Sequence, residues 1–79
     1  MATKLNPGNY DCYANLEPDE PYFLLMARDR HAPNIVRRWA KRRERAIQEG
    51  TYPESDREKV KEARAVASQM ETWRKNNRG

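Results

Sequence analysis

Cysteine, histidine and glycine are scarce in this chain of 79 residues, which contains one Cys, one His and three Gly. A single cysteine excludes an intramolecular disulfide, and a single histidine beside it excludes a Cys/His zinc site. The glycines (Gly8, Gly50 and Gly79) are too far apart to form a glycine-rich phosphate loop. We therefore expect no metal, no cofactor and no catalysis, and we interpret the chain as a binding protein.

Long hydrophobic runs are also missing. The longest covers residues 22–27, far short of the roughly 20 residues that span a bilayer. The first residues contain no apolar stretch typical of a signal peptide. An unpaired Cys12 suits a reducing compartment. We expect a cytoplasmic protein with no membrane partner.

The core that such a chain can build is small. Hydrophobic residues make up 37% of the sequence, and a domain of this size gains only about 3–5 kcal/mol from its core. Small domains usually compensate with a disulfide, a metal or self-association. Since the first two are excluded, we expect a single helical domain over residues 1–79 that forms a homo-oligomer.

Charge is distributed unevenly along the chain, whose formal net charge is +4. Residues 1–27 carry one lysine against four acids, a net charge of −3, whereas residues 28–45 carry eight bases against two acids, a net charge of +6. Residues 46–79 are nearly balanced, at +1. This asymmetry indicates an anionic partner or head-to-tail self-association, although a solvated basic helix face explains it equally well.

Two amphipathic helices are predicted in the second half of the chain. The first covers residues 32–49, with Asp29 as a candidate N-cap and Gly50 at the position of a C′ glycine. The second covers residues 55–76 and begins with a Ser-Asp-Arg-Glu capping box. A short connector makes them an antiparallel hairpin of the all-α class. We interpret Trp39 and Trp73 as core residues.

The N-terminal region is harder to assign. Prolines, asparagines and a glycine punctuate residues 1–21, which we interpret as an irregular arm. Residues 22–29 (YFLLMARD) match either a short strand or one or two helical turns. Nothing else in the chain resembles a strand that could pair with them, so we favour a short helix that follows Pro21.

One charge interrupts the apolar stripe of the first helix. Arg43 lies in the middle of that stripe, where an unpaired charge is costly. It can pair with an acid of the second helix, such as Glu62 or Glu71, or it can face a bound anion or an oligomer seam. Both interpretations remain open from the sequence.

Aromatic and basic residues come together near the first helix. Tyrosine rings can stack on nucleobases while arginines bind phosphates. The candidate ligand-binding residues are Tyr10, Tyr13, Tyr22, Arg28, Arg30 and Arg43. A second basic set (Arg37, Arg38, Lys41, Arg42 and Arg45) fills the polar arc of the first helix, as expected of a surface that follows nucleic-acid phosphates.

Residues 19–29 (DEPYFLLMARD), followed by Ala32-Pro33, Val36-Arg37 and Trp39-Ala40, carry a resemblance to known proteins. This pattern resembles small helical proteins of phages and prophages with a D-E-P-x-F-x-L-x-A-x-D signature. Residues 62–73 match the second helix of those proteins through Glu62-Ala63, Ala67, Met70-Glu71 and Trp73. The resemblance covers about half of the chain.

The size, helical content and phage signature also resemble the anti-CBASS sponges. Those proteins form hexamers and sequester cyclic di- and trinucleotide immune signals with a tyrosine and a basic residue from neighbouring protomers. The resemblance implies that Tyr10 or Tyr13 pairs with Arg28 or Arg30. Our leading hypothesis is a phage immune-evasion protein that binds a cyclic oligonucleotide in the host cytoplasm without hydrolysing it.

Two alternatives remain. The basic helix can bind nucleic acid non-specifically, because no Asn or Gln stands among its cations to read base edges. The acidic N-terminal third can instead engage a host defence enzyme as a protein-binding inhibitor.

Overall fold

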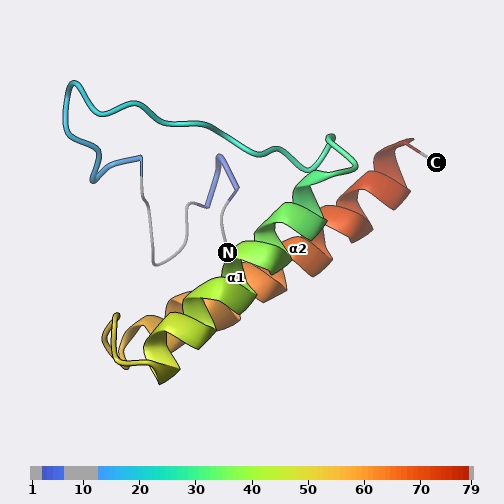
Figure 1. Ribbon diagram of the computed structural model, residues 1–79. Coiled ribbons are helices and arrows are strands. Elements are labelled where there is room, and N and C mark those ends of the chain that lie inside the picture. The colour runs from blue at the N-terminus through green and yellow to red at the C-terminus, as the bar shows by residue number, and fades with distance from the viewer. Residues whose placement is uncertain (1–2, 7–12, 79) are drawn as a thin grey trace.

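The computed structural model describes residues 3–6 and 13–78, and within these ranges it contains two helices and no strand (Figure 1). Helix α1 spans Ala32–Gln48 and helix α2 spans Asp56–Arg78. The helices lie side by side and run in opposite directions (Figure 1). The predicted all-α hairpin is confirmed, while the oligomeric state stays a prediction.

The start of α1 differs from the prediction. The N-cap residue is His31, which makes no capping side-chain hydrogen bond, and Pro33 lies in the first turn. The carboxylate of Asp29 accepts a hydrogen bond from the His31 backbone N–H at 2.9 Å. Asp29 therefore stabilises the turn before the helix, and its prediction as N-cap is wrong by two residues.

The end of α1 confirms the role of Gly50. Its φ is 82°, in the left-handed region that glycine adopts without a steric penalty. The Gly50 N–H bonds the Ile47 carbonyl at 3.1 Å, and the Thr51 N–H bonds the Ala46 carbonyl at 2.9 Å. This pair of bonds is a Schellman motif. It ends α1 and turns the chain toward α2.

The core between the helices consists of small side chains. The buried hydrophobic residues are Ala32, Ala40, Ile47, Val60 and Ala67. Trp39 and Trp73, in contrast, remain 38% and 44% exposed. Their prediction as core residues is therefore wrong, and the cluster that packs between the helices consists instead of Ala40, Ile47, Val60 and Ala63. The hairpin therefore has a narrow seam rather than a deep core.

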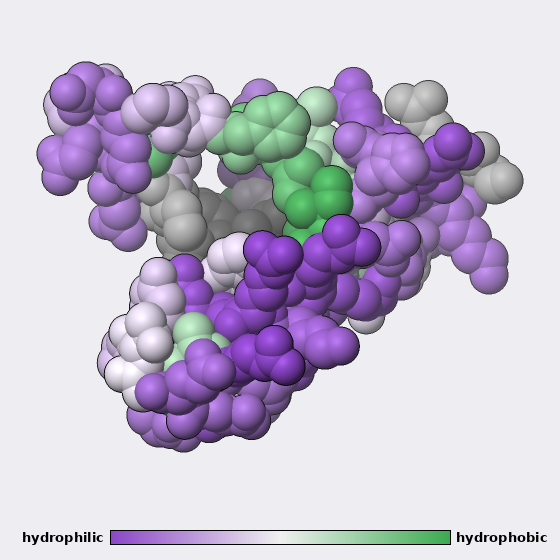
Figure 2. Space-filling model, in the orientation of Figure 1, coloured by the Kyte–Doolittle hydropathy of each residue, from purple (hydrophilic) through white to green (hydrophobic). Residues whose placement is uncertain are grey.

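The segment before α1 is extended. Residues 22–26 have no regular secondary structure and residues 27–31 form turns, so the prediction of a short helix over 22–29 is wrong. Eight residues gain too few backbone hydrogen bonds to offset helix nucleation unless they pack on something. Here Phe23 is 85% exposed and Leu24 is 63% exposed. Figure 2 shows apolar surface between this segment and the helices, whose visible surface is mostly hydrophilic.

Candidate functional site

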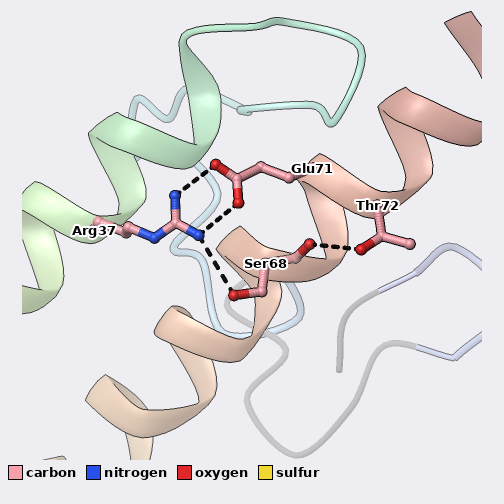
Figure 3. Close-up of polar contacts among 4 residues, drawn as sticks. All are labelled: Arg37, Ser68, Glu71 and Thr72. Carbon is pink, nitrogen blue, oxygen red and sulfur yellow. Dashed lines mark hydrogen bonds and ion pairs between the residues drawn. The ribbon is translucent and has the colours of Figure 1, made fainter. Parts of the chain in front are cut away.

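The arginine nearest the start of α1 is held by α2. The guanidinium of Arg37 donates two hydrogen bonds of 2.7 Å to the carboxylate of Glu71 and one of 3.4 Å to the Ser68 hydroxyl (Figure 3). This bidentate pairing raises the pKa of Arg37 and lowers that of Glu71. Arg37 therefore joins the two helices, and its charge is partly used by Glu71, while its place in the nucleic-acid surface stays a prediction.

Arg43 is held near the connector between the helices. Its Nη1 lies 2.9 Å from the Asp56 carboxylate, and both side chains are largely covered, at 21% and 18% exposed. The guanidinium also stacks 3.8 Å from the centre of the Tyr52 ring and 5.1 Å from that of Trp39. Its partner is an acid of the second helix, as one of the two interpretations held. That charge is therefore already paired within the hairpin, while the role of Arg43 as a ligand contact stays a prediction.

The acid that follows Arg43 on α1 is paired as well. The Glu44 carboxylate accepts a hydrogen bond of 2.6 Å from Nη2 of Arg64 on α2. This bond, more than the remaining charge interaction, lowers the pKa of Glu44. Three ion pairs thus cross between the helices and use the charges that face α2.

The opposite side of α1 carries four cations without such partners. We call Arg38, Lys41, Arg42 and Arg45 the cation row. All four are exposed, and in the part of the chain that the structure describes none forms an ion pair. An open depression of ≈ 570 Å³ runs among them, with Glu44 and Gln48 completing its lining. The cation row is therefore a continuous positive surface open to an anion.

The predicted tyrosine site is assembled in part. The rings of Tyr13 and Tyr22 meet edge to face, with centroids 5.7 Å apart and an interplanar angle of 80°. Both side chains are exposed. Arg28 and Arg30 are exposed residues of the turns before α1, and among the described residues neither bonds an acid or contacts a tyrosine ring. Tyr10 lies outside the described residues.

Apolar side chains border the cation row, and this border was not among the features predicted from the sequence. Ile35 is 48% exposed and lies one turn before Trp39 on α1. Their spacing of four residues places both on one face, next to Arg38 and Arg42. The spacing of the apolar residues along α1 already indicates such a border, because those residues form a stripe that is wider than the surface that α2 covers.

Other site chemistries find little support in the described ranges. No three His, Cys, Asp or Glu side chains among residues 3–6 and 13–78 lie together as a metal site would require. In the same ranges no helix is long and apolar enough to cross a membrane. The described surface therefore offers cations and aromatic rings as its candidate binding groups.

Comparison of the chain with models of protein families, with curated proteins and with solved structures finds no match. The resemblance to phage proteins and to cyclic-nucleotide sponges therefore stays a prediction. The candidate site is defined by its own geometry, which is a row of unpaired cations on α1 and a pair of exposed tyrosine rings in the preceding arm.

Proposed function

We propose that this protein binds phosphate-bearing oligonucleotides through the cation row and releases them unchanged. The observation that carries the proposal is the division of the α1 cations into two groups. Those that face α2 are neutralised by Glu71 and Asp56. Those that face away are exposed and have no acid partner in the described part of the chain.

The spacing of the cation row suits a chain of phosphates. From Arg38 to Arg45 the helix rises about 10 Å, at 1.5 Å per residue. Four cations along that length place a positive charge near each phosphate of a short backbone stretch. Counterion release then supplies the affinity, which falls as salt rises. Because the contacts reach phosphates rather than base edges, binding is insensitive to sequence.

Fluorescence anisotropy of a labelled single-stranded oligonucleotide over a salt series tests this proposal. We expect a slope of log K against log salt of about −2.8 if all four cations bind phosphates, and of about −1.4 if only Lys41 and Arg45 do, at ~0.7 per phosphate. The variant K41Q/R45Q should reduce the slope by about 1.4 and weaken binding. The matched control K61Q/K75Q removes the same charge from exposed positions of α2 and should leave the slope unchanged.

Two results would contradict oligonucleotide binding by the cation row. One is the absence of any anisotropy change at low salt. The other is an equal loss in K41Q/R45Q and K61Q/K75Q, since net charge alone would then explain the binding. Circular dichroism of both variants ensures that the helices are intact.

A second candidate is sequestration of a cyclic di- or trinucleotide immune signal by a phage anti-CBASS protein, and the Tyr13–Tyr22 ring pair favours it. Exposed rings supply stacking surfaces for bases, worth about 1–3 kcal/mol each, while nearby cations bind the phosphates. In this proposal Arg28 and Arg30 of a neighbouring protomer face the tyrosines, and the assembly is a homo-oligomer, with a hexamer as the expected state.

Native mass spectrometry with a mixture of cyclic di- and trinucleotides tests the second candidate. We expect an oligomer that gains the mass of whole ligands and returns them intact on denaturation. Tyr22→Ala should raise the dissociation constant by about 5- to 150-fold, because the loss of one stack is worth 1–3 kcal/mol, whereas Tyr22→Phe keeps the ring and should bind normally. An oligomer that gains no ligand mass would exclude this candidate and leave linear nucleic acid.

A further inference from the structure

The chain exposes more surface than a compact protein of its mass. Its accessible surface is 6758 Å² for 9.4 kDa, whereas a compact monomer of that mass exposes about 5,000 Å². The difference of about 1,700 Å² is roughly twice the 800 Å² that each partner buries in a standard interface. An excess of this size suits a chain that uses two separate surfaces for association.

The first such surface is the acidic arm, residues 17–26. It begins with three exposed acids (Glu17, Asp19 and Glu20) and continues with exposed apolar residues (Tyr22, Phe23, Leu24 and Met26). The acidic end of the arm forms a turn, in which the Glu20 carboxylate accepts a hydrogen bond of 3.1 Å from the Glu17 backbone N–H. Among the described residues no base pairs with Glu17 or Asp19. The acidic arm thus presents apolar and negative groups side by side.

The second surface is on α1 and has the opposite charge. Ile35, Arg38, Trp39 and Arg42 follow the i, i+3, i+4, i+7 spacing that defines one helix face. We call these four residues the docking face. Ile35 and Trp39 are 48% and 38% exposed, and both arginines are exposed and unpaired in the described ranges. The docking face combines apolar and positive groups, which complements the acidic arm in both respects.

We infer that the acidic arm of one copy docks on the docking face of a second copy. Apolar contact supplies the affinity, and the pairing of acids with Arg38 and Arg42 fixes the register. Within one chain the arm is directed away from α1 (Figure 1). Two consecutive turns set that direction, through hydrogen bonds from Asp29 N–H to the Met26 carbonyl at 2.9 Å and from Ala32 N–H to the Asp29 carbonyl at 3.0 Å.

This arrangement leaves part of the cation row open. Lys41 and Arg45 lie outside the docking face, so they remain available to a phosphate ligand in the assembled protein. Each chain contributes two different surfaces, so the assembly is a reciprocal dimer, a ring or an open filament, depending on the rotation between neighbours. The inference does not rest on oligonucleotide binding, because association is measured without any nucleotide and one of its variants, E17K/D19K, lies outside the cation row.

A charge exchange tests the docking by native mass spectrometry and sedimentation velocity. The variant E17K/D19K makes the arm positive, and R38E/R42E makes the docking face negative. Each variant alone opposes like charges, which costs several kcal/mol, so we expect its self-association to weaken by more than about tenfold. Mixed together, the two variants present opposite charges again and should form hetero-oligomers with the same number of chains as the wild-type oligomer.

A matched control reverses the charge of α2 instead of that of the docking face. K61E/K75E reverses two exposed cations of α2 and should associate like the wild type. Phe23→Ser removes apolar contact and should weaken association without a change of charge. The docking is overturned by a wild-type chain that stays monomeric at high micromolar concentration, by variants that associate normally, or by a mixture that fails to restore the oligomer. If each variant alone loses helix and the mixture regains it, the docking is supported, because folding then depends on docking.

Discussion

The two sides of helix α1 carry the same residue type in different roles. On the side that faces α2, Arg37 and Arg43 are joined to Glu71 and Asp56, and these bonds fix how the helices pack. On the side that faces away, Arg38 and Arg42 have no acid within reach in the described ranges. The comparison shows that composition alone overstates the basic surface, because part of the charge is used inside the hairpin.

The same contrast bears on how a hairpin with such a thin seam is held together. Three of its five buried hydrophobic residues are alanines, which allow close approach but bury little area. Ion pairs at the rim of the seam add specificity, although exposed pairs each contribute only about 0–1 kcal/mol. The pair between Arg43 and Asp56 is more covered than the others, so it should contribute the most.

The largest expected effect therefore comes from Arg43. Arg43→Ala leaves Asp56 covered without its partner and removes the stack on Tyr52. We expect a loss of about 2 kcal/mol in the free energy of unfolding, since breaking a fully buried pair costs about 3–5 and this one is partly exposed. Arg42→Ala, on the other side of the helix, should change it by less than about 0.5 kcal/mol. Urea unfolding followed by circular dichroism measures both, and equal losses would contradict the comparison.

The second-largest effect on stability is expected at Gly50, in the turn that ends α1 and leads to α2. Gly50 has a φ of 82°, and nothing lies within 4 Å of the position of an added Cβ. Gly50→Ala should therefore cost about 1 kcal/mol from backbone conformation alone, without a clash. Gly50→Asn should cost less, because asparagine tolerates the left-handed region. Thermal unfolding separates the two, and an unchanged melting temperature in Gly50→Ala would show that the turn is not needed.

A smaller effect is expected in acid. The pKa values of Glu71 and Glu44 are lowered by their arginine partners, so these carboxyls stabilise the fold above the ordinary glutamate value of about 4.3. As pH falls through the lowered values, both states become protonated and that stability disappears. Arg37→Gln should flatten this dependence by removing the partner of Glu71. Urea midpoints of the wild type and of Arg37→Gln at neutral and acidic pH measure this dependence. An equal shift of the midpoint in the two proteins would contradict the prediction.

The smallest effect on folding belongs to the cation row. Arg45 is exposed and unpaired in the described part of the chain, so Arg45→Gln should leave the urea midpoint unchanged within error. The same substitution should reduce the salt dependence of oligonucleotide binding by about 0.7. A shifted midpoint with an unchanged salt slope would show that Arg45 is structural.

Local signals were read well from the sequence because they depend on nearest neighbours. Gly50 follows the last turn of α1 as a helix-ending glycine should, and the apolar spacing located both helices. One of the two interpretations of Arg43, pairing with a second-helix acid, is confirmed, but the acid is Asp56 rather than Glu62 or Glu71. The register of the hairpin places Arg43 near the connector and hence beside Asp56, while Glu71 lies opposite Arg37.

The N-terminal segment shows where local reasoning fails. Residues 22–29 have helix-compatible composition, yet residues 22–26 are extended and exposed. A short segment forms a helix only where packing supports it, and Phe23 and Leu24 stay exposed in the described structure. The exposure of the two tryptophans has a similar basis, since apolar character favours burial without specifying which side chains the register of the hairpin covers.

A helical hairpin with a basic first helix follows from the sequence alone, because periodicity and helix-ending residues act within a few positions. Which of those bases are paired with acids depends on the folded hairpin. The crossing of α1 and α2 brings particular acids within 3 Å of Arg37 and Arg43, and such contacts join residues that are 34 and 13 positions apart. Charge can be counted along a chain, but its neutralisation depends on distances that exist only after folding.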